Sequence, residues 1–140
     1  MDAIVMLRND HKEVEALFKR LEKGDLTVVP DICTALTQHA IIEEEEFYPA
    51  VRSEVDGALD DVLEAIEEHH VVKVLVAELE ALEPSDETYK AKATVLMELV
   101  RHHVEEEETE MFPEVRHALG RKRLTEIGEQ LEKAKAAFAA

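Results

Sequence analysis

The sequence of 140 residues has little of what disulfide-bonded, membrane-spanning and nucleic-acid-binding proteins need. It contains one cysteine, Cys33, so no internal disulfide can form, and no stretch approaches the roughly 18 apolar residues of a membrane span. Lysine and arginine number 16 against 33 acidic residues, which gives a net charge of −17. A chain this acidic repels phosphate backbones and anionic lipids, so we expect neither a nucleic-acid partner nor a membrane partner.

Aromatic residues, glycine and proline are also scarce. Aromatics make up 4% of the chain, tryptophan is absent, and glycine and proline occur four times each. The remaining composition, rich in Ala, Leu, Glu, Lys and Val, favours helices. Because 46% of the residues are hydrophobic, we predict one domain over residues 1–140. The first residues lack the basic and apolar stretches of a signal peptide, so the expected location is cytoplasmic.

The few glycines and prolines divide the chain into five expected helices. Pro49 and Pro113 should break the second and fourth helices, and Ser85 should cap the fourth. Short connections predict an all-α, antiparallel up-down-up-down four-helix bundle over about residues 2–119, with an additional C-terminal helix over about 121–139. The expected helices cover about residues 2–23, 30–55, 58–82, 85–119 and 122–138.

Each of the first four expected helices has an apolar stripe in which one position is a histidine. In the fourth helix, for example, Leu96, Leu99 and Val100 lead to that histidine. The neighbouring His70 and His102 lie further toward the polar side and are weaker candidates for the interior. The inward histidines predicted in this way are His11, His39, His69 and His103.

Two glutamates, Glu43 and Glu107, follow His39 and His103 by four residues and fall on the same stripes. A lone ionised carboxylate is costly to bury without a counter-charge or a metal. Four other glutamates of these acidic runs are expected mostly on the solvated side or at its rim. They are Glu44, Glu45, Glu105 and Glu106.

An internal repeat relates the two glutamate-bearing helices. The segments "HAIIEEEEFYPAVR" (39–52) and "HVEEEETEMFPEVR" (103–116) align without a gap, 64 residues apart, and share seven positions from the first His to the last Arg. The first and third helices match more weakly. This pattern predicts a duplicated helical hairpin and an approximate two-fold axis.

Four imidazoles and two carboxylates facing one interior would destabilise an empty bundle, whereas a bound cation would make each of them a ligand. Imidazole and carboxylate without a thiolate cluster suit iron, manganese or zinc. Six ligands exceed the need of one ion that keeps an open position. Two carboxylates bridging two ions would use all six, so we predict a dinuclear site.

In these residues the sequence resembles the hemerythrin family, specifically bacterial hemerythrin-like proteins with an HHE cation-binding domain. The resemblance covers about residues 7–117, in the order His, His-x3-Glu, "EEHH" and His-x3-Glu, with "FYP" and "MFP" tails. It implies a non-haem, oxo- or hydroxo-bridged di-iron centre, in which manganese or zinc could replace iron. The four inward histidines would be terminal ligands, and Glu43 and Glu107 would be bridging carboxylates. Oxygen-carrying members place the last carboxylate five residues after its histidine, which makes Glu108 the alternative to Glu107.

One position departs from the oxygen-carrying members. They have a further histidine four residues after the third-helix histidine, where this chain has Lys73. The Lys73 stem could pack while its ammonium reaches solvent. Alternatively, the residue leaves one iron with an additional open position, or hydrogen-bonds a bound peroxide or hydroxide. Glu46, His70 and Tyr48 are further candidates for contacts with the site, Tyr48 as a ligand, an electron donor or a packing residue.

The expected function is to bind, sense or react with dioxygen, nitric oxide or peroxide, rather than to carry oxygen reversibly. No catalytic residue is predicted, and peroxide consumption is the enzymatic alternative. A second interpretation is an iron storage, donation or iron-centre repair protein. A third is an interaction module that the metal only stabilises.

Overall fold

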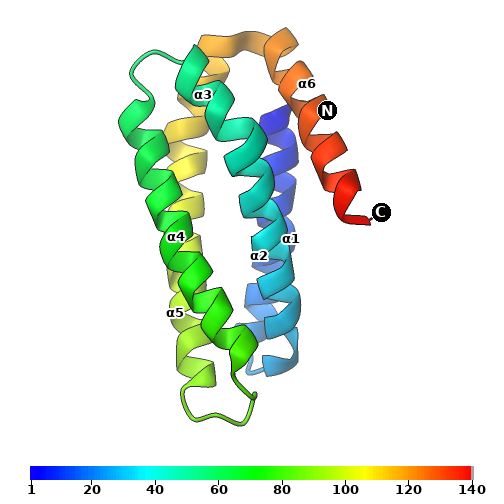
Figure 1. The fold of residues 1–140 in the computed structure, drawn as a ribbon, viewed down its shortest axis with the longest axis vertical. Helices are drawn as coiled ribbons and strands as arrows, with labels where there is room; N and C mark the ends of the chain where they lie inside the picture. The colour runs from blue at the N-terminus through cyan, green and yellow to red at the C-terminus, as the bar shows by residue number, and fades with distance from the viewer. Residues whose placement is uncertain (140) are drawn as a thin grey trace.

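The computed structural model describes residues 1–139, and four long helical segments form its centre (Figure 1). These segments run antiparallel, and the last part of the chain packs beside them. This arrangement confirms the predicted all-α bundle with an additional C-terminal helix. No helix among residues 1–139 is both long and apolar enough to cross a membrane. The segments are α1 (Ala3–Glu22), α2 (Val29–Ile42) continued by α3 (Tyr48–Glu54), α4 (Leu59–Ala81), and α5 (Tyr89–Glu106) continued by α6 (Phe112–Ala139), with a short 3₁₀ turn at Leu26–Val28.

Two π-helical turns lie where the sequence predicted only breaks at proline. They are η2 (Glu43–Phe47), between α2 and α3, and η3 (Glu107–Met111), between α5 and α6. In each turn the first backbone N–H after it donates to the carbonyl of the leading glutamate, five residues earlier. The prolines that follow have no N–H, so the ordinary i−4 bond is missing there and a wider turn is tolerated. The helices therefore continue past both prolines.

The start of α5 corrects one expectation, because the helix begins at Tyr89 and Ser85 does not cap it. The side chain of Asp86 accepts hydrogen bonds from the backbone N–H and the hydroxyl of Thr88, at 2.8 and 2.6 Å. These local bonds hold the chain in a turn before the helix starts.

A change of direction divides α6 at Gly120, whose φ of 74° lies in the left-handed region that glycine adopts readily. The part before Gly120 completes the bundle. The part after it buries Leu124, Ile127 and Leu131 and runs beside α1 and α2 (Figure 1). The structure thus places the C-terminal helix close to its predicted position.

The core consists of two apolar clusters with a polar layer between them. One cluster contains Leu7 and Phe112, and the other contains Val14 and Leu96. In α1 the polar layer is occupied by His11, between Leu7 and Val14, and the other long segments cross from one cluster to the other in the same way. Leu99, expected on the α5 stripe, is instead exposed at 36%.

Candidate metal centre

The polar layer brings together all six residues that the sequence placed inside the bundle. They form two groups of possible ligand atoms, and within each group the atoms lie within 4.8 Å of one another. Both groups contain the same two glutamates, one from each π turn, so two cations placed in the two groups would share two carboxylates. The first group is His11, His39, Glu43 and Glu107, and the second group is His69, His103, Glu43 and Glu107.

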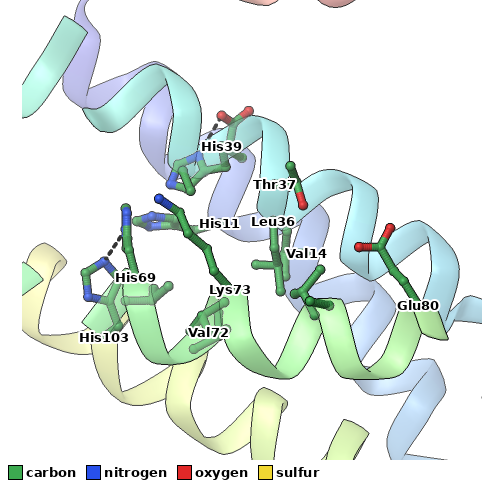
Figure 2. A pocket seen from close by; sticks show the side chains of 16 residues that line it. His11, Val14, Leu36, Thr37, His39, His69, Val72, Lys73, Glu80 and His103 are labelled. Carbon is green, nitrogen blue, oxygen red and sulfur yellow. Dashed lines mark hydrogen bonds and ion pairs between the residues drawn. The ribbon is translucent and has the colours of Figure 1, made fainter. Parts of the chain in front are cut away.

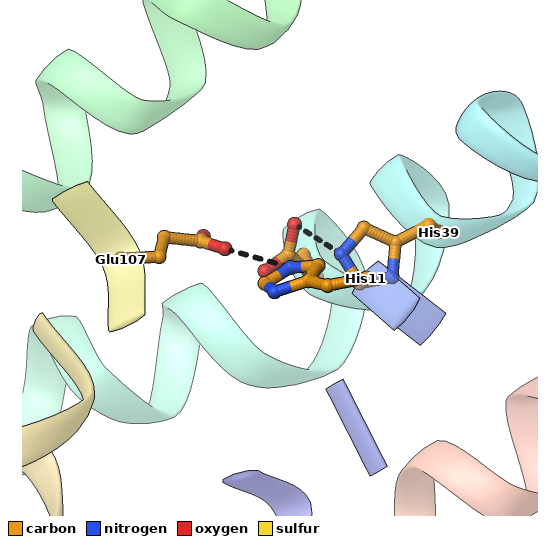
Figure 3. A group of neighbouring side chains, drawn as sticks. His11, His39 and Glu107 are labelled. Atoms are coloured by element: carbon orange, nitrogen blue, oxygen red, sulfur yellow. Dashed lines mark ion pairs between the residues drawn. The ribbon is translucent and has the colours of Figure 1, made fainter. Parts of the chain in front are cut away.

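Each glutamate contacts one histidine of each group. Oε1 of Glu43 lies 3.1 Å from Nε2 of His39 and 3.2 Å from Nε2 of His69. Oε1 of Glu107 lies 3.3 Å from Nε2 of His11, the contact drawn in Figure 3. Oε2 of the same carboxylate lies 3.2 Å from Nε2 of His103. This is the arrangement that two bridging carboxylates require.

Several of these atoms are buried without a hydrogen-bond partner among residues 1–139. They are Nε2 of His11 and of His39, both oxygens of Glu43, and Oε1 of Glu107. Two pairs of them lie at ion-pair distance, Nε2 of His39 with Oε1 of Glu43 at 3.1 Å and Nε2 of His11 with Oε1 of Glu107 at 3.3 Å. Buried polar atoms are normally satisfied, and a cation between them would use the lone pairs that have no donor. The donor set therefore fits a metal ion.

The outer nitrogen of every inward histidine contacts a further carboxylate. A carboxylate can only accept a hydrogen bond, so Nδ1 carries the proton. In the neutral imidazole the lone pair is then on Nε2, facing the interior, and the ring is held in place. The Nδ1 atoms of His11, His39, His69 and His103 donate to Glu108, Asp10, Glu44 and Glu68, at 2.6, 2.9, 2.8 and 2.7 Å.

These outer carboxylates change the interpretation of two residues. Glu44 was expected mostly on the solvated side or at its rim, and it lies half-buried, where it binds Nδ1 of His69. Glu108, the alternative to Glu107, lies on the outer nitrogen of His11 and belongs to neither group. The sequence did hold a signal, because Asp10 immediately precedes His11 and Glu44 immediately follows Glu43. The second half of the repeat has the same order, so the approximate two-fold symmetry extends to these partners.

Tyr48 makes the two groups different. Its side chain is 1% exposed, and its hydroxyl donates to Oε2 of Glu107. The hydroxyl oxygen of Tyr48 also lies 3.3 Å from Nε2 of His69 and 3.3 Å from Nε2 of His103. The equivalent residue in the other half of the repeat is Phe112, which stacks 5.9 Å from the His11 ring and offers no hydroxyl. Within residues 1–139, only the second group therefore has a phenol beside its histidines.

The charges within the layer compensate one another. Burial lowers the pKa of His39, but attraction to Glu43 and the hydrogen bond to Asp10 outweigh it and raise the pKa to about 10. Burial likewise opposes protonation of His103, yet Glu107 raises its pKa to about 10. Burial raises the pKa of Glu43, but the adjacent histidines hold it well below its usual range. Without a metal, the layer thus contains protonated histidines beside ionised glutamates.

A cavity of about 180 Å³ opens onto the histidines from one side of the layer. A single water molecule needs only about 10–15 Å³ of such space. Figure 2 shows the histidines at one end of the cavity and Glu80 toward the other. Most of the wall is apolar and comes from α1, α2, α4 and α5. The apolar lining consists of Val14, Leu36, Ala40, Val72, Val76, Ala77, Val100 and Val104.

Lys73 lines this cavity and joins neither group. Its Nζ donates to Oε1 of Glu44 at 2.8 Å, while 54% of its side chain is exposed. Figure 2 shows Lys73 at the same end of the cavity as the histidines. Of the other candidates, His70 is exposed and Glu46 is half-buried, and both lie outside the two groups.

A helical bundle that holds four histidines around two shared, buried glutamates defines a class of metal-binding proteins. This chain belongs to the hemerythrin family, since the family description "Hemerythrin HHE cation binding domain" matches residues 2–115. The resemblance seen in the sequence is thereby confirmed, and the family and the two groups together fit a metal-binding site.

A curated relative is 30% identical over 135 residues. It is named "DNA nickase" and comes from Nostoc sp. (strain PCC 7120 / SAG 25.82 / UTEX 2576). The alignment covers 93% of this chain and 38% of that protein, so the chain spans well under half the length of the relative. No solved structure matches the chain.

Proposed function

We propose that the polar layer binds two iron ions, and that dioxygen or nitric oxide reaches them through the apolar cavity to be bound, sensed or transformed. The observation that carries this proposal is the sharing of Glu43 and Glu107 between two pairs of histidines. Histidine nitrogen with carboxylate oxygen suits iron, manganese and zinc. Iron, when bound, supplies the open positions and the redox chemistry that these gases need, whereas zinc has no redox chemistry.

The protein's own residues would orient and shield the site. The outer carboxylates fix each imidazole with Nε2 toward the interior. The apolar clusters on both sides of the layer exclude bulk water. The apolar wall of the cavity favours an uncharged diatomic molecule over a more polar one such as peroxide. Tyr48 keeps its proton, because burial and the charges of Glu107 and Glu43 raise its pKa well above the usual value.

Lys73 affects whether a bound gas would be carried reversibly or would be sensed or transformed. It occupies the position where oxygen-carrying members of the family have a further histidine, and it binds Glu44, the partner of His69. Because Nζ of Lys73 donates to Glu44 and belongs to neither group, a metal in the second group would have fewer protein ligands and more open positions than in an oxygen carrier. We therefore propose sensing or reaction in preference to reversible carriage. If the parent and a Lys73→His variant bind and release dioxygen identically, this part of the proposal is wrong.

DNA is not part of the proposal, although the Nostoc relative is named a DNA nickase. A net charge of −17 opposes contacts with phosphates. The chain also covers only 38% of that relative.

An anaerobic titration of metal-free protein with Fe²⁺ tests the proposal. We expect two ions per chain, and an absorption spectrum that changes when dioxygen or nitric oxide is added. A Glu43→Gln variant should lose tight binding, whereas Glu45→Gln, an exposed position two residues away, should keep it. Loosely held, exchangeable iron would favour storage or donation. A protein whose thermal stability is unchanged by chelation would exclude both functions.

A further inference from the structure

A second opening reaches the polar layer from another side. It is a groove of about 50 Å³ between α4 and the segment from α5 to η3, and it shares only His103 with the apolar cavity. Its lining contains carboxylates and, within residues 1–139, no lysine or arginine. The carboxylates of this acidic groove are Asp61, Glu64, Glu68, Glu106, Glu107 and Glu110.

Two residues of the groove lining, Glu68 and Glu106, form a possible metal-binding group with His102, which does not itself line the groove. Glu68, His102 and Glu106 offer one ligand atom each, and the three atoms lie within 4.8 Å of one another. Nε2 of His102 lies 2.8 Å from Oε1 of Glu106. The exposed fractions of the His102, Glu106 and Glu68 side chains are 65%, 33% and 24%, so this outer triad is open to solvent.

The inner end of the groove is Glu107, which is 2% exposed. Its Oε1 has no hydrogen-bond partner within the described part of the chain and lies in the polar layer, 3.3 Å from Nε2 of His11. A buried carboxylate oxygen without a donor is a position that a cation would satisfy. Glu68 connects the two ends, because it belongs to the outer triad and also binds Nδ1 of His103 at 2.7 Å.

We propose that the acidic groove is the route by which a divalent metal ion reaches the polar layer, and that the outer triad is its first binding site. This inference rests on the proposed function, because it presumes that the layer takes up metal. A cleft lined by one sign of charge concentrates ions of the opposite sign and speeds their arrival. The triad is solvated and binds weakly enough to release the ion inward. Metal and gas thus reach the layer by different openings, one acidic and one apolar.

Stopped-flow uptake of Co²⁺ by metal-free protein at low ionic strength tests the route. A His102→Ala/Glu106→Gln variant should take up Co²⁺ at least about tenfold more slowly than the parent, with the final stoichiometry unchanged. The matched control is His70→Ala/Glu45→Gln, which removes the same groups at exposed positions outside the groove. Its rate should equal that of the parent.

A second variant tests the middle of the route without touching the triad. Glu64→Gln/Glu110→Gln changes two exposed residues that line the groove, and it should also slow uptake. If both groove variants take up Co²⁺ as fast as the control, the route is wrong while the proposed metal site stands. A parent protein that takes up no Co²⁺ in its polar layer would overturn the route and leave the metal site itself unsupported.

Discussion

Metal binding to the polar layer should release protons from its histidines. Attraction to Glu43 and Glu107 outweighs burial and raises the pKa of His39 and of His103 to about 10 in the metal-free protein. Both imidazoles are therefore charged near pH 8, where an ordinary histidine, with a pKa of about 6.5, is neutral. A metal ion binds only neutral imidazole, so loading must displace these protons.

The size of the effect follows from the number of protons. Each released proton changes the binding free energy by about 1.4 kcal/mol per pH unit, so two protons make the overall affinity rise about a hundredfold per unit up to about pH 10. The stability of the metal-free protein changes in the opposite direction. A histidine pKa raised by folding contributes stability that is complete below about pH 6.5 and is lost as the pH rises through about 10.

Calorimetric titration with Co²⁺ near pH 8, in buffers of different ionisation enthalpy, counts the protons released. We expect about two from His39 and His103, and a further fraction from His69, whose pKa is also raised. An Asp10→Asn variant loses the negative charge of the carboxylate whose hydrogen bond helps to raise the pKa of His39, so it should release fewer protons. If the parent releases none and its affinity is flat between about pH 7.5 and 9, the reasoning is refuted.

Three further predictions concern the surroundings of the layer. Tyr48→Phe removes a buried hydrogen bond to Glu107 and should destabilise the metal-free protein by about 1.5–3 kcal/mol in urea unfolding, but the metal-loaded protein by less. An equal loss in both states would contradict this. Lys135→Met removes the 2.5 Å ion pair to Asp10, the hydrogen-bond partner of His39. In a competition assay with a chelator, we expect metal affinity to fall by less than about tenfold. The control is Lys133→Met, at an exposed position, which should leave the affinity unchanged. Gly128→Ala would place a Cβ against the carbonyl oxygen of Met1. Thermal unfolding should therefore show a loss of about 1–3 kcal/mol in the free energy of unfolding. Unchanged stability would show that the N-terminus moves aside easily.

The helical period was enough to predict the inward residues. Positions that face the interior recur along each helix with the helical period, whatever the helix packs against. His11, His39 and Glu43 each occupy such a position. The repeat added the relation between the halves. Neither inference needed the contacts between helices, which is why both could be made from the sequence.

The details that the sequence did not show depend on contacts between helices or on competing local bonds. Asp10 precedes His11 in the chain but binds His39 on another helix. Leu99 has an apolar side chain, yet no helix covers it enough to bury it. Each π turn shifts the side chains after it by one residue relative to an uninterrupted α-helix. A proline in the sequence indicates only that an ordinary helical turn is unfavourable there. At the start of α5, the side chain of Asp86 competes with the helix.

The repeat has a consequence for how the two halves of the bundle depend on each other. The first hairpin supplies His11, His39 and Glu43, and each of the two groups also needs Glu107 from the second hairpin. Neither hairpin alone can complete a site, so ions held there would act as cross-links between the halves. Separation of the hairpins would release both ions together, which couples unfolding of either half to the loss of all bound metal in one cooperative event.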